Sequence, residues 1–490
     1  MISASTRFLY GAGGAVVAVK EAAYTMFILL FYTQVLGLNG TVTGLVIALS
    51  LVWDGISDPL VGSLSDRLRS RFGRRHPFMA LSILPLGLGF VGLFSPPQAV
   101  VDDSTYLAAW LLFWSLWVRT FDTTFTIPHL ALSADITADY HDRTQVLGAR
   151  MGFMFLFGVF LPALAMLLIF PQQNGVDGRF EQYRYPLYGL LSCAVVWVMA
   201  TLSTLGTREH IRVEALQPGH DTGGPATLRA LARDLWRTLG NRNFRYLIGY
   251  DIAATSAYGV IASLNMLVWT FFWQLSAMEI SVILSVPTLL AVLLVMLTLG
   301  PLGRRTSKQR VVQLSLLGMI LNCLWLYPLQ LYELLPADSN DLLFALNFLF
   351  TLIFMYLFML RIVNSTSIVA DLTDEHELDH GVRQEAGFFA VTNFVSKMAT
   401  VVGPLYGGLA LDVVGLETGM RPGYVPLGTL HGLVYALGLG VIPPLLVALW
   451  FIRRVHTSQT RVETVQREIA ARRALESGES GDSLSIHSRH

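Results

Sequence analysis

The sequence predicts an all-α polytopic membrane protein with twelve transmembrane helices in two bundles of six. Of its 490 residues, 53% are hydrophobic and only 14% are charged, whereas a soluble domain has about 25% charged residues. Long apolar stretches recur along the chain, and a helix needs about 20 apolar residues to cross a bilayer. The formal net charge is +0, so the composition indicates no strongly charged partner and no nucleic acid.

Twelve stretches are long and apolar enough to be expected spans, and a polar segment divides them into two sets. The first set is Leu9–Leu36, Thr41–Leu64, Pro77–Phe94, Tyr106–Ala134, Val146–Phe170 and Pro186–Leu205. The second set is Phe244–Leu275, Ile280–Leu299, Val311–Leu331, Leu342–Ala370, Ala386–Val413 and Leu430–Ile452. We therefore expect bundles at residues 1–206 and 244–453, and a linker with a surface helix at 207–243. A partly disordered tail is expected at 454–490.

Lysine and arginine in the short loops predict the orientation, because cytoplasmic loops carry an excess of both. The loops after the second and eighth spans and the linker are rich in them, whereas "QVLGLNG", "SPPQAVVDDS" and "YELLPADSND" have none. One exception, "DGRFEQYRY", holds Arg179 and Arg184. The N-terminus lacks the pattern of a cleaved signal peptide. We expect both termini in the cytoplasm and the protein in a bacterial inner membrane.

Two six-span halves joined by a cytoplasmic linker are the plan of the major facilitator fold. The segments "GSLSDRLRSRFGRR" and "GPLGRRTSKQR" occupy corresponding places in the two halves. They resemble the loop motif of the major facilitator superfamily and its degenerate second copy.

Two aspartates interrupt the second span in "DGISDP". Asp54 and Asp58 are one helical turn apart and face the same side, where they repel each other unless a cation lies between them. Pro59 cannot donate to the carbonyl of Gly55, so that oxygen is free to act as a ligand. Two carboxylates and a carbonyl suit Na+, Li+ or H+. The alternative is a structural ion pair that joins the halves.

Other charged residues lie within spans, where an ionisable group usually faces a cavity or a partner. Lys397 lies well inside the eleventh span, and we expect Asp54 and Asp58 to be its counter-ions. Arg119 and Asp122 are three residues apart and are expected to pair. Arg361 suits a carboxylate or phosphate, or else pairs with Asp251 or Glu21. The remaining residues of this kind are Lys20, adjacent to Glu21 in the first span, and Arg150 in the fifth.

Charged residues also follow the spans at the predicted cytoplasmic side. They are Asp66, Arg74, Arg75, Asp135 and Arg143 in the first half, and Asp371 and Asp374 in the second. We expect these loops to form a gate that breaks as the halves rock. A metal site in "DLTDEHELDH" is the less simple interpretation of its acids and histidines.

Together these segments resemble the glycoside–pentoside–hexuronide:cation symporter family, whose members are melibiose-permease-like. "VWDGISDPLVGSLSDRLRSRFGRRHPF" is similar to the family signature, and "TIPHLAL", "DRTQVLGARMGF", "VADLTDEHE" and "GFFAVTNFVSKMA" follow in family order. The resemblance implies that Asp54 and Asp58 bind Na+, Li+ or H+ and that Thr123 contributes. It also implies that Lys397 and Arg150 correspond to conserved charges of the family.

The sugar-binding positions of the family do not carry over. The resemblance places them on Ala18, Thr126, Leu130 and Ile362, where the family has two aspartates and two tryptophans. The same fold serves sodium-dependent lysophospholipid transporters, and "EAGFFAVTNFVSKMA" resembles these at least as closely. The expected coupling and substrate residues are Lys397, Arg150, Asp122, Arg119, Arg361, Asp251, Lys20, Glu21, Thr126 and Asn364.

The sequence therefore predicts a monomeric cation-coupled symporter of a small organic solute, with Na+ or H+ as coupling ion and no other cofactor. The alternative is a symporter of lysophospholipids or other amphiphiles. A membrane sensor or an intramembrane enzyme is the third hypothesis. It lacks support, because no nucleophile, metal or P-loop motif is visible and the tail after Arg453 is short for a signalling domain.

Overall fold

The computed structural model describes residues 2–68, 70–137, 139–173, 175–211, 240, 242–332, 334, 340–380 and 385–455, and the structural statements below concern these residues. This part of the chain is helical, as the all-α prediction requires. Eleven of its helices are long and apolar enough to cross a membrane. The predicted fourth span is the 33-residue helix α7 (Ser104–Ile136). It is less apolar than these eleven because Arg119, Asp122 and several threonines and tryptophans interrupt it.

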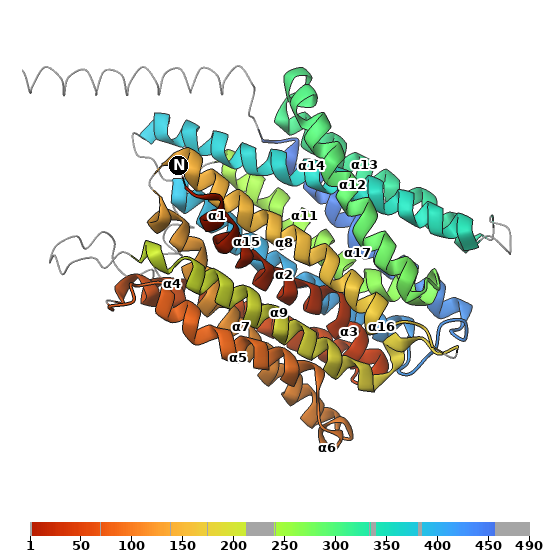
Figure 1. Cartoon of the computed structure of the whole chain (residues 1–490). Helices are drawn as coiled ribbons and strands as arrows, with labels where there is room; N and C mark the ends of the chain where they lie inside the picture. The colour runs from red at the N-terminus through yellow and green to blue at the C-terminus, as the bar shows by residue number, and fades with distance from the viewer. Residues whose placement is uncertain are drawn as a thin grey trace, which may run out of the picture.

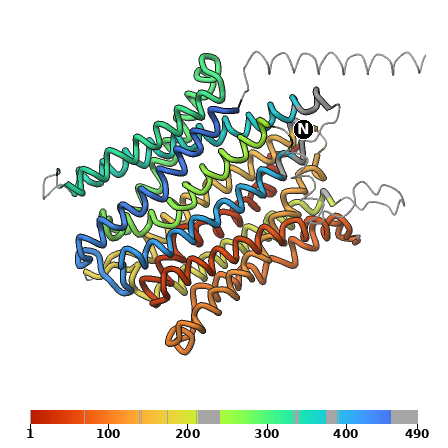
Figure 2. Tube along the Cα trace, turned by 180° about the vertical axis from the view of Figure 1, so that it is seen from behind, coloured from red at the N-terminus to blue at the C-terminus, as the bar shows by residue number. Residues whose placement is uncertain are grey.

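The helices run side by side, with the first half of the chain in red to yellow and the second half in green to blue (Figures 1 and 2). The first span consists of α1 (Ala4–Ala12), α2 (Gly14–Ala22), η1 (Ala23–Phe27), α3 (Ile28–Leu30) and η2 (Phe31–Val35). The other elements of the first half are α4 (Gly40–Arg67), α5 (His76–Phe94), α6 (Gln98–Val101), α7, α8 (Tyr140–Leu168), η3 (Gly178–Phe180), η4 (Gln182–Arg184), α9 (Tyr185–Gly206) and η5 (Arg208–His210). The second half contains α11 (Arg242–Leu267), η6 (Val268–Phe272), α12 (Ala277–Arg305), α13 (Lys308–Leu331), α14 (Asn340–His380), α15 (Glu385–Thr400), α16 (Val402–Val414) and α17 (Leu427–Ile452).

Most spans lie within a few residues of their predicted limits, and two depart from the prediction more clearly. The tenth extends to His380 as α14, beyond the predicted end at Ala370. The eleventh is divided into α15 and α16 at Val401, because Pro404 has no N–H to donate to the carbonyl of Thr400. The expected surface helix of the linker lies outside the described residues, and so does the tail after residue 455. The domain limits therefore stay predictions.

Wide π turns end the first span of each half. In η2 and its continuation, the amide of Leu38 donates to the carbonyl of Tyr32 at 2.8 Å. After η6, the amide of Leu275 donates to the carbonyl of Trp269 at 2.9 Å in the same pattern. Similar irregular turns at corresponding places fit two structural repeats of one unit.

Helices α4 and α16 join the two halves at the end of the molecule remote from the chain's N-terminus, here called the distal end. A Cβ atom on Gly408 would lie 2.1 Å from the carbonyl oxygen of Gly40, so glycine is required for this approach. The carboxylate of Asp412 accepts from the amides of Gly40 and Thr41, at 3.0 and 2.8 Å. Asp412 thus caps the N-terminus of α4 from the other half.

A buried arginine forms a second link at the distal end. Arg179 pairs with Asp177 and donates hydrogen bonds of 2.7 Å to the hydroxyl of Thr270 and to the carbonyl of Leu275. Both acceptors belong to the second half of the chain. Arg184 is also buried and paired. The two arginines that break the charge pattern of the loops are therefore internal and do not report on orientation.

Candidate functional site

A cluster of buried charges lies where α2, α4, α7 and α15 meet, and Asp54 is at its centre. Asp54 is 1% exposed. Its Oδ2 atom lies 3.0 Å from Nζ of Lys397, 3.2 Å from Nη1 of Arg119 and 3.8 Å from Nζ of Lys20. Three cations from three helices thus surround one carboxylate, which offsets the cost of burying it.

Asp58 lies one turn further along α4 and shares two partners with Asp54. The ammonium of Lys397 contacts both carboxylates. The hydroxyl of Thr123 on α7 lies 3.0 Å from Oδ1 of Asp54 and 2.9 Å from Oδ1 of Asp58, and it donates to one at a time. The structure therefore brings the predicted cation-binding carboxylates and threonine together. Lys397 lies between the two carboxylates, at the predicted cation site, whose cation role stays a prediction.

The predicted pair of Arg119 with Asp122 is wrong. Arg119 turns to Asp54, and Asp122 accepts from Lys20 of α2 at 2.7 Å. Lys20 also lies 3.5 Å from its neighbour Glu21, whose side chain is largely exposed. Arg119 and Asp122 share a face of α7, but α4 presents a closer partner to Arg119 and α2 presents a closer partner to Asp122.

Sequence reasoning missed the uncharged groups that hold Arg119 in place. Nε of Arg119 donates to the hydroxyl of Ser50 at 2.8 Å, and the guanidinium lies 4.4 Å from the ring centre of Tyr24. Ser57 lies 3.3 Å from the hydroxyl of Thr123. The sequence contained a signal for these serines, because Ser50 lies one helical turn before Asp54 and Ser57 one turn after it, on the same face of α4.

Helix α4 continues through Pro59 without a break, from Gly40 to Arg67. Gly55 packs against the second half, since a Cβ atom there would lie 2.4 Å from Cε of Met398. The close packing against Met398 by itself accounts for a glycine at position 55. Its carbonyl as a cation ligand stays a prediction.

Arg361 on α14 and Arg150 on α8 are buried without a carboxylate in ion-pair contact in the described part of the chain. Arg361 donates to the hydroxyl of Tyr250 at 3.1 Å. The expected ion pairs of Arg361 with Asp251 or Glu21 are therefore wrong for this conformation.

Three other expected substrate residues lie on α7, α11 and α14. Asp251 on α11 accepts a hydrogen bond from Ser396, the residue before Lys397. Asn364 is buried on α14 and donates to the carbonyl of Leu360 at 2.8 Å. Thr126 is half-buried on α7. The substrate roles of all these residues stay predictions.

The predicted gate residues of the first half pair within that half. Arg74 lies 2.6 Å from Asp135, and Arg75 lies 2.6 Å from Asp66. Arg143 is exposed at the start of α8.

In the second half, Lys308 lies 2.7 Å from Asp371, and the side chain of Asp374 lies outside the described residues. These pairs fix the loops of each half. A gate between the halves stays a prediction.

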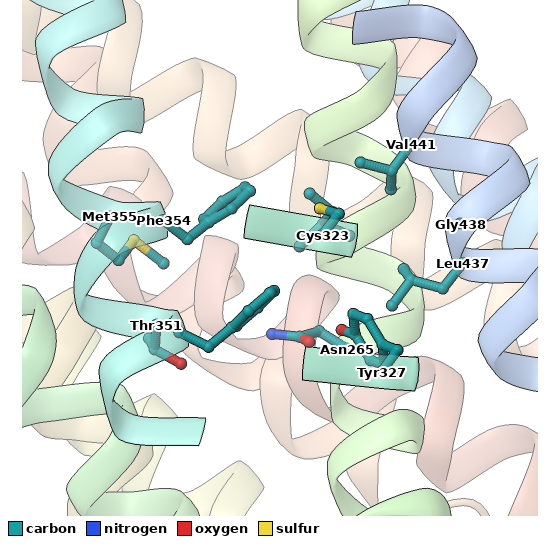
Figure 3. A pocket seen from close by; sticks show the side chains of 11 residues that line it. Asn265, Cys323, Tyr327, Thr351, Phe354, Met355, Leu437, Gly438 and Val441 are labelled. Carbon is teal, nitrogen blue, oxygen red and sulfur yellow. The ribbon is translucent and has the colours of Figure 1, made fainter. Parts of the chain in front are cut away.

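An apolar cavity of about 40 Å³ lies inside the second half, between α11, α13, α14 and α17 (Figure 3). Phe354, Met355 and Leu437 are among its apolar lining residues, and Asn265 and Tyr327 bring polar groups to one side. It is separate from the cluster around Asp54, whose residues come from α2, α4, α7 and α15.

Comparisons with known proteins agree with this architecture. The family model described as "MFS/sugar transport protein" matches residues 9–457. The putative glycoside/cation symporter YagG of Escherichia coli is 25% identical over 468 residues, 92% of each chain. The sodium-dependent lysophosphatidylcholine symporter 1-A of Danio rerio is 26% identical over 30% of this chain and 27% of that one. The crystal structure of the nucleoside transporter NupG aligns with a TM-score of 0.59 and 16% identity, over 93% and 99% of the two chains, which supports the fold alone.

The fold and the buried charge cluster define an integral membrane transporter of the major facilitator type, not an enzyme. The chain belongs to the MFS/sugar transport protein family, as the match over residues 9–457 shows. The predicted fold class and the resemblance to the glycoside and cation symporters are thereby confirmed.

Proposed function

We propose that the protein is a cation-coupled symporter of an organic solute that works by alternating access. The observation that carries this proposal is the contact of Lys397 with both Asp54 and Asp58. The carboxylates belong to the first half and the lysine to the second, so a cation that binds the carboxylates must displace a contact between the halves. YagG, similar over most of its length, is named as a putative glycoside/cation symporter, which supports the same class.

Coupling follows from the charges at this site. When the site is empty, Lys397 bridges the two carboxylates and holds the two halves together at their centre. A Na+ ion or a proton that binds the carboxylates frees Lys397, which changes how the halves meet. If the termini are cytoplasmic, the distal links through Asp412 and Arg179 close the outer side, so this conformation is closed to the outside. We also propose that the protein acts as a monomer in a bacterial inner membrane.

The test measures thermal unfolding of the purified full-length protein in NaCl, in KCl and across pH. We expect Na+ or H+ to raise the unfolding temperature of the wild type. Asp58→Asn removes the response, because Asp58 is the carboxylate whose side chain is more accessible, at 23%. Glu417→Gln, at an exposed acid of the second half, is the matched control and keeps it. An unchanged cation response in Asp58→Asn would exclude this cation site.

The substrate is identified with the same purified protein. Proteoliposomes are screened with glycosides, sugar acids and lysophospholipids under an inward Na+ gradient and under a proton gradient. Uptake driven by either gradient identifies both the solute and the coupling ion. Asp58→Asn must lose gradient-driven uptake.

A symporter of lysophospholipids or other amphiphiles is the second candidate, and the apolar cavity in the second half favours it. Rings of Phe350, Phe354 and Phe358 are stacked along α14 with centres 6.3 Å apart at each step, and two of them line the cavity. Such a surface suits an alkyl chain better than a sugar. The lysophosphatidylcholine symporter of Danio rerio is a partial relative.

The cavity offers a direct test. Gly438 lines the cavity, and a Cβ atom there meets nothing within 4 Å, so Gly438→Leu places a larger apolar side chain at the cavity wall. If the alkyl chain binds there, this variant weakens binding of lysophosphatidylcholine, while Gly428→Leu on the same helix leaves it unchanged. Equal binding in both variants removes this candidate.

A further inference from the structure

Arg361 is a buried cation whose charge is not matched by an ion-paired carboxylate. It is 4% exposed, and its guanidinium carbon lies 5.2 Å from the ring centre of Phe358 and 5.9 Å from that of Tyr250. Nη1 donates to the hydroxyl of Tyr250. Nε has no hydrogen-bond partner. Two aromatic faces and one hydroxyl are thus the partners that the structure records for a charge that is costly to bury.

The other intramembrane cations of the site differ from Arg361. Lys20, Arg119 and Lys397 each contact a carboxylate of the cluster around Asp54. They are therefore neutralised within the protein and cannot receive an anion without breaking those contacts. Arg150 resembles Arg361, with a buried Nε atom that has no partner, but it lies in the first half.

The group around Arg361 borders the first half, because α11 contacts η1 and α3 of the first span. The ring of Tyr258 on α11 stacks on Phe358 with centres 4.7 Å apart. Tyr258, Phe358 and Asp251 are all half-buried. A solute between the halves can therefore reach these three side chains, whereas Arg361 itself is buried beside them.

The guanidinium of Arg361 retains N–H donors that an anion can use. Arginine binds a carboxylate or a phosphate with two parallel N–H donors. Tyr250 accepts from Nη1 and Nε has no hydrogen-bond partner, while no hydrogen bond of Nη2 is recorded among the described residues. Asp251, the nearest acid on α11, accepts from Ser396 and lies beyond ion-pair distance.

We propose that Arg361 binds an anionic group of the transported solute, a carboxylate or a phosphate ester, through Nε and Nη2. The proposal rests on the proposed function, because it takes the space between the halves to be the path of the solute. A sugar acid and a lysophospholipid both carry such a group. A neutral glycoside does not, so Arg361 selects against it.

The test compares pairs of solutes in which one member carries an anionic group and the other is neutral. Methyl glucuronide and methyl glucoside, and glycerol 3-phosphate and glycerol, are titrated against the full-length protein in phosphatidylcholine nanodiscs with Na+ present. The wild type is expected to bind at least one anion about 10-fold or more tightly than its neutral partner. Arg361→Gln loses this preference, and Arg361→Lys retains part of it. Arg421→Gln, at an exposed arginine of the same half, behaves as the wild type.

A second arm distinguishes a soluble anion from a lipid headgroup. The unfolding temperature is measured in nanodiscs with and without phosphatidylglycerol. Stabilisation by this lipid that disappears in Arg361→Gln, without binding of either soluble anion, supports the proposal with a lipid headgroup as the ligand. If no anion and no anionic lipid distinguishes Arg361→Gln from the wild type, the proposal is wrong.

Two further measurements distinguish the anion site from a structural role of Arg361 and from failure of the symporter proposal. A structural ion pair would make Arg361→Gln unfold at a lower temperature without ligand, whereas loss of an unmatched charge leaves that temperature equal or raises it. The cation response through Asp58 is measured in the same samples. If it persists while Arg361 has no effect on anions, only the anion site is refuted. If it is absent in the wild type, the symporter proposal fails.

Discussion

The two carboxylates of the cation site should differ sharply in what their removal costs. Asp54 is 1% exposed and contacts Lys397, Arg119 and Lys20. Asp54→Asn keeps the shape of the side chain but leaves Arg119 without a carboxylate, and loss of one partner from a buried ion pair costs about 3–5 kcal/mol. Asp58→Asn costs about 1 kcal/mol or less, because Lys397 still lies 3.0 Å from Asp54.

Thermal unfolding of the purified variants without added Na+ measures this difference. At about 2 °C for each kcal/mol in a large chain, Asp54→Asn should unfold about 6 °C or more below the wild type, and Asp58→Asn within about 2 °C of it. Both variants should lose the cation response. Asp102→Asn, at an exposed acid outside the cluster, is the control. Equal unfolding temperatures for Asp54→Asn and Asp58→Asn would refute the assignment of Asp54 as the common counter-ion.

Two more predictions concern the distal contacts between the halves. Arg179→Gln loses the ion pair with Asp177 and weakens the links to Thr270 and Leu275, so spin labels placed on α4 and α16 at the distal end should report a larger population of long distances. An unchanged distance distribution would mean that Arg179 holds its own loop and not the halves. Gly408→Val forces α4 and α16 apart, since a Cβ atom would lie 2.1 Å from a backbone oxygen. Transport by this variant should fall at least about 10-fold in a protein that still folds. Uptake at the wild-type rate would contradict this prediction.

At the cation site, the sequence predicts which side chains share a helix face but not which partners they meet. The spacing of Asp54 and Asp58 predicts that they share a face of a helix, and in the structure one hydroxyl, that of Thr123, lies within hydrogen-bond distance of both. The spacing of Arg119 and Asp122 also places them on one face, yet they do not pair. Helical periodicity determines the direction of a side chain. The partner it meets depends on the neighbouring helices.

Asp412 and Arg179 show the same limit for contacts between the halves. An aspartate at the end of a span gives no indication that it caps a helix 372 residues earlier in the chain. Arg179 looks like a solvated loop cation until its partners from the second half are known. Both contacts join residues far apart in the chain, and no local pattern encodes them.

The sequence by itself determined the class of the protein, its helical spans and the position of a carboxylate pair inside a membrane helix. These follow from hydropathy and from the 3.6-residue period, which are properties of neighbouring residues. The tertiary structure decided which charges neutralise each other. It assigns Lys20, Arg119 and Lys397 to acids of the first half, and it leaves Arg361 with aromatic and hydroxyl partners. Such assignments depend on how the helices pack, because a charge pairs with the nearest acid in space and not in sequence.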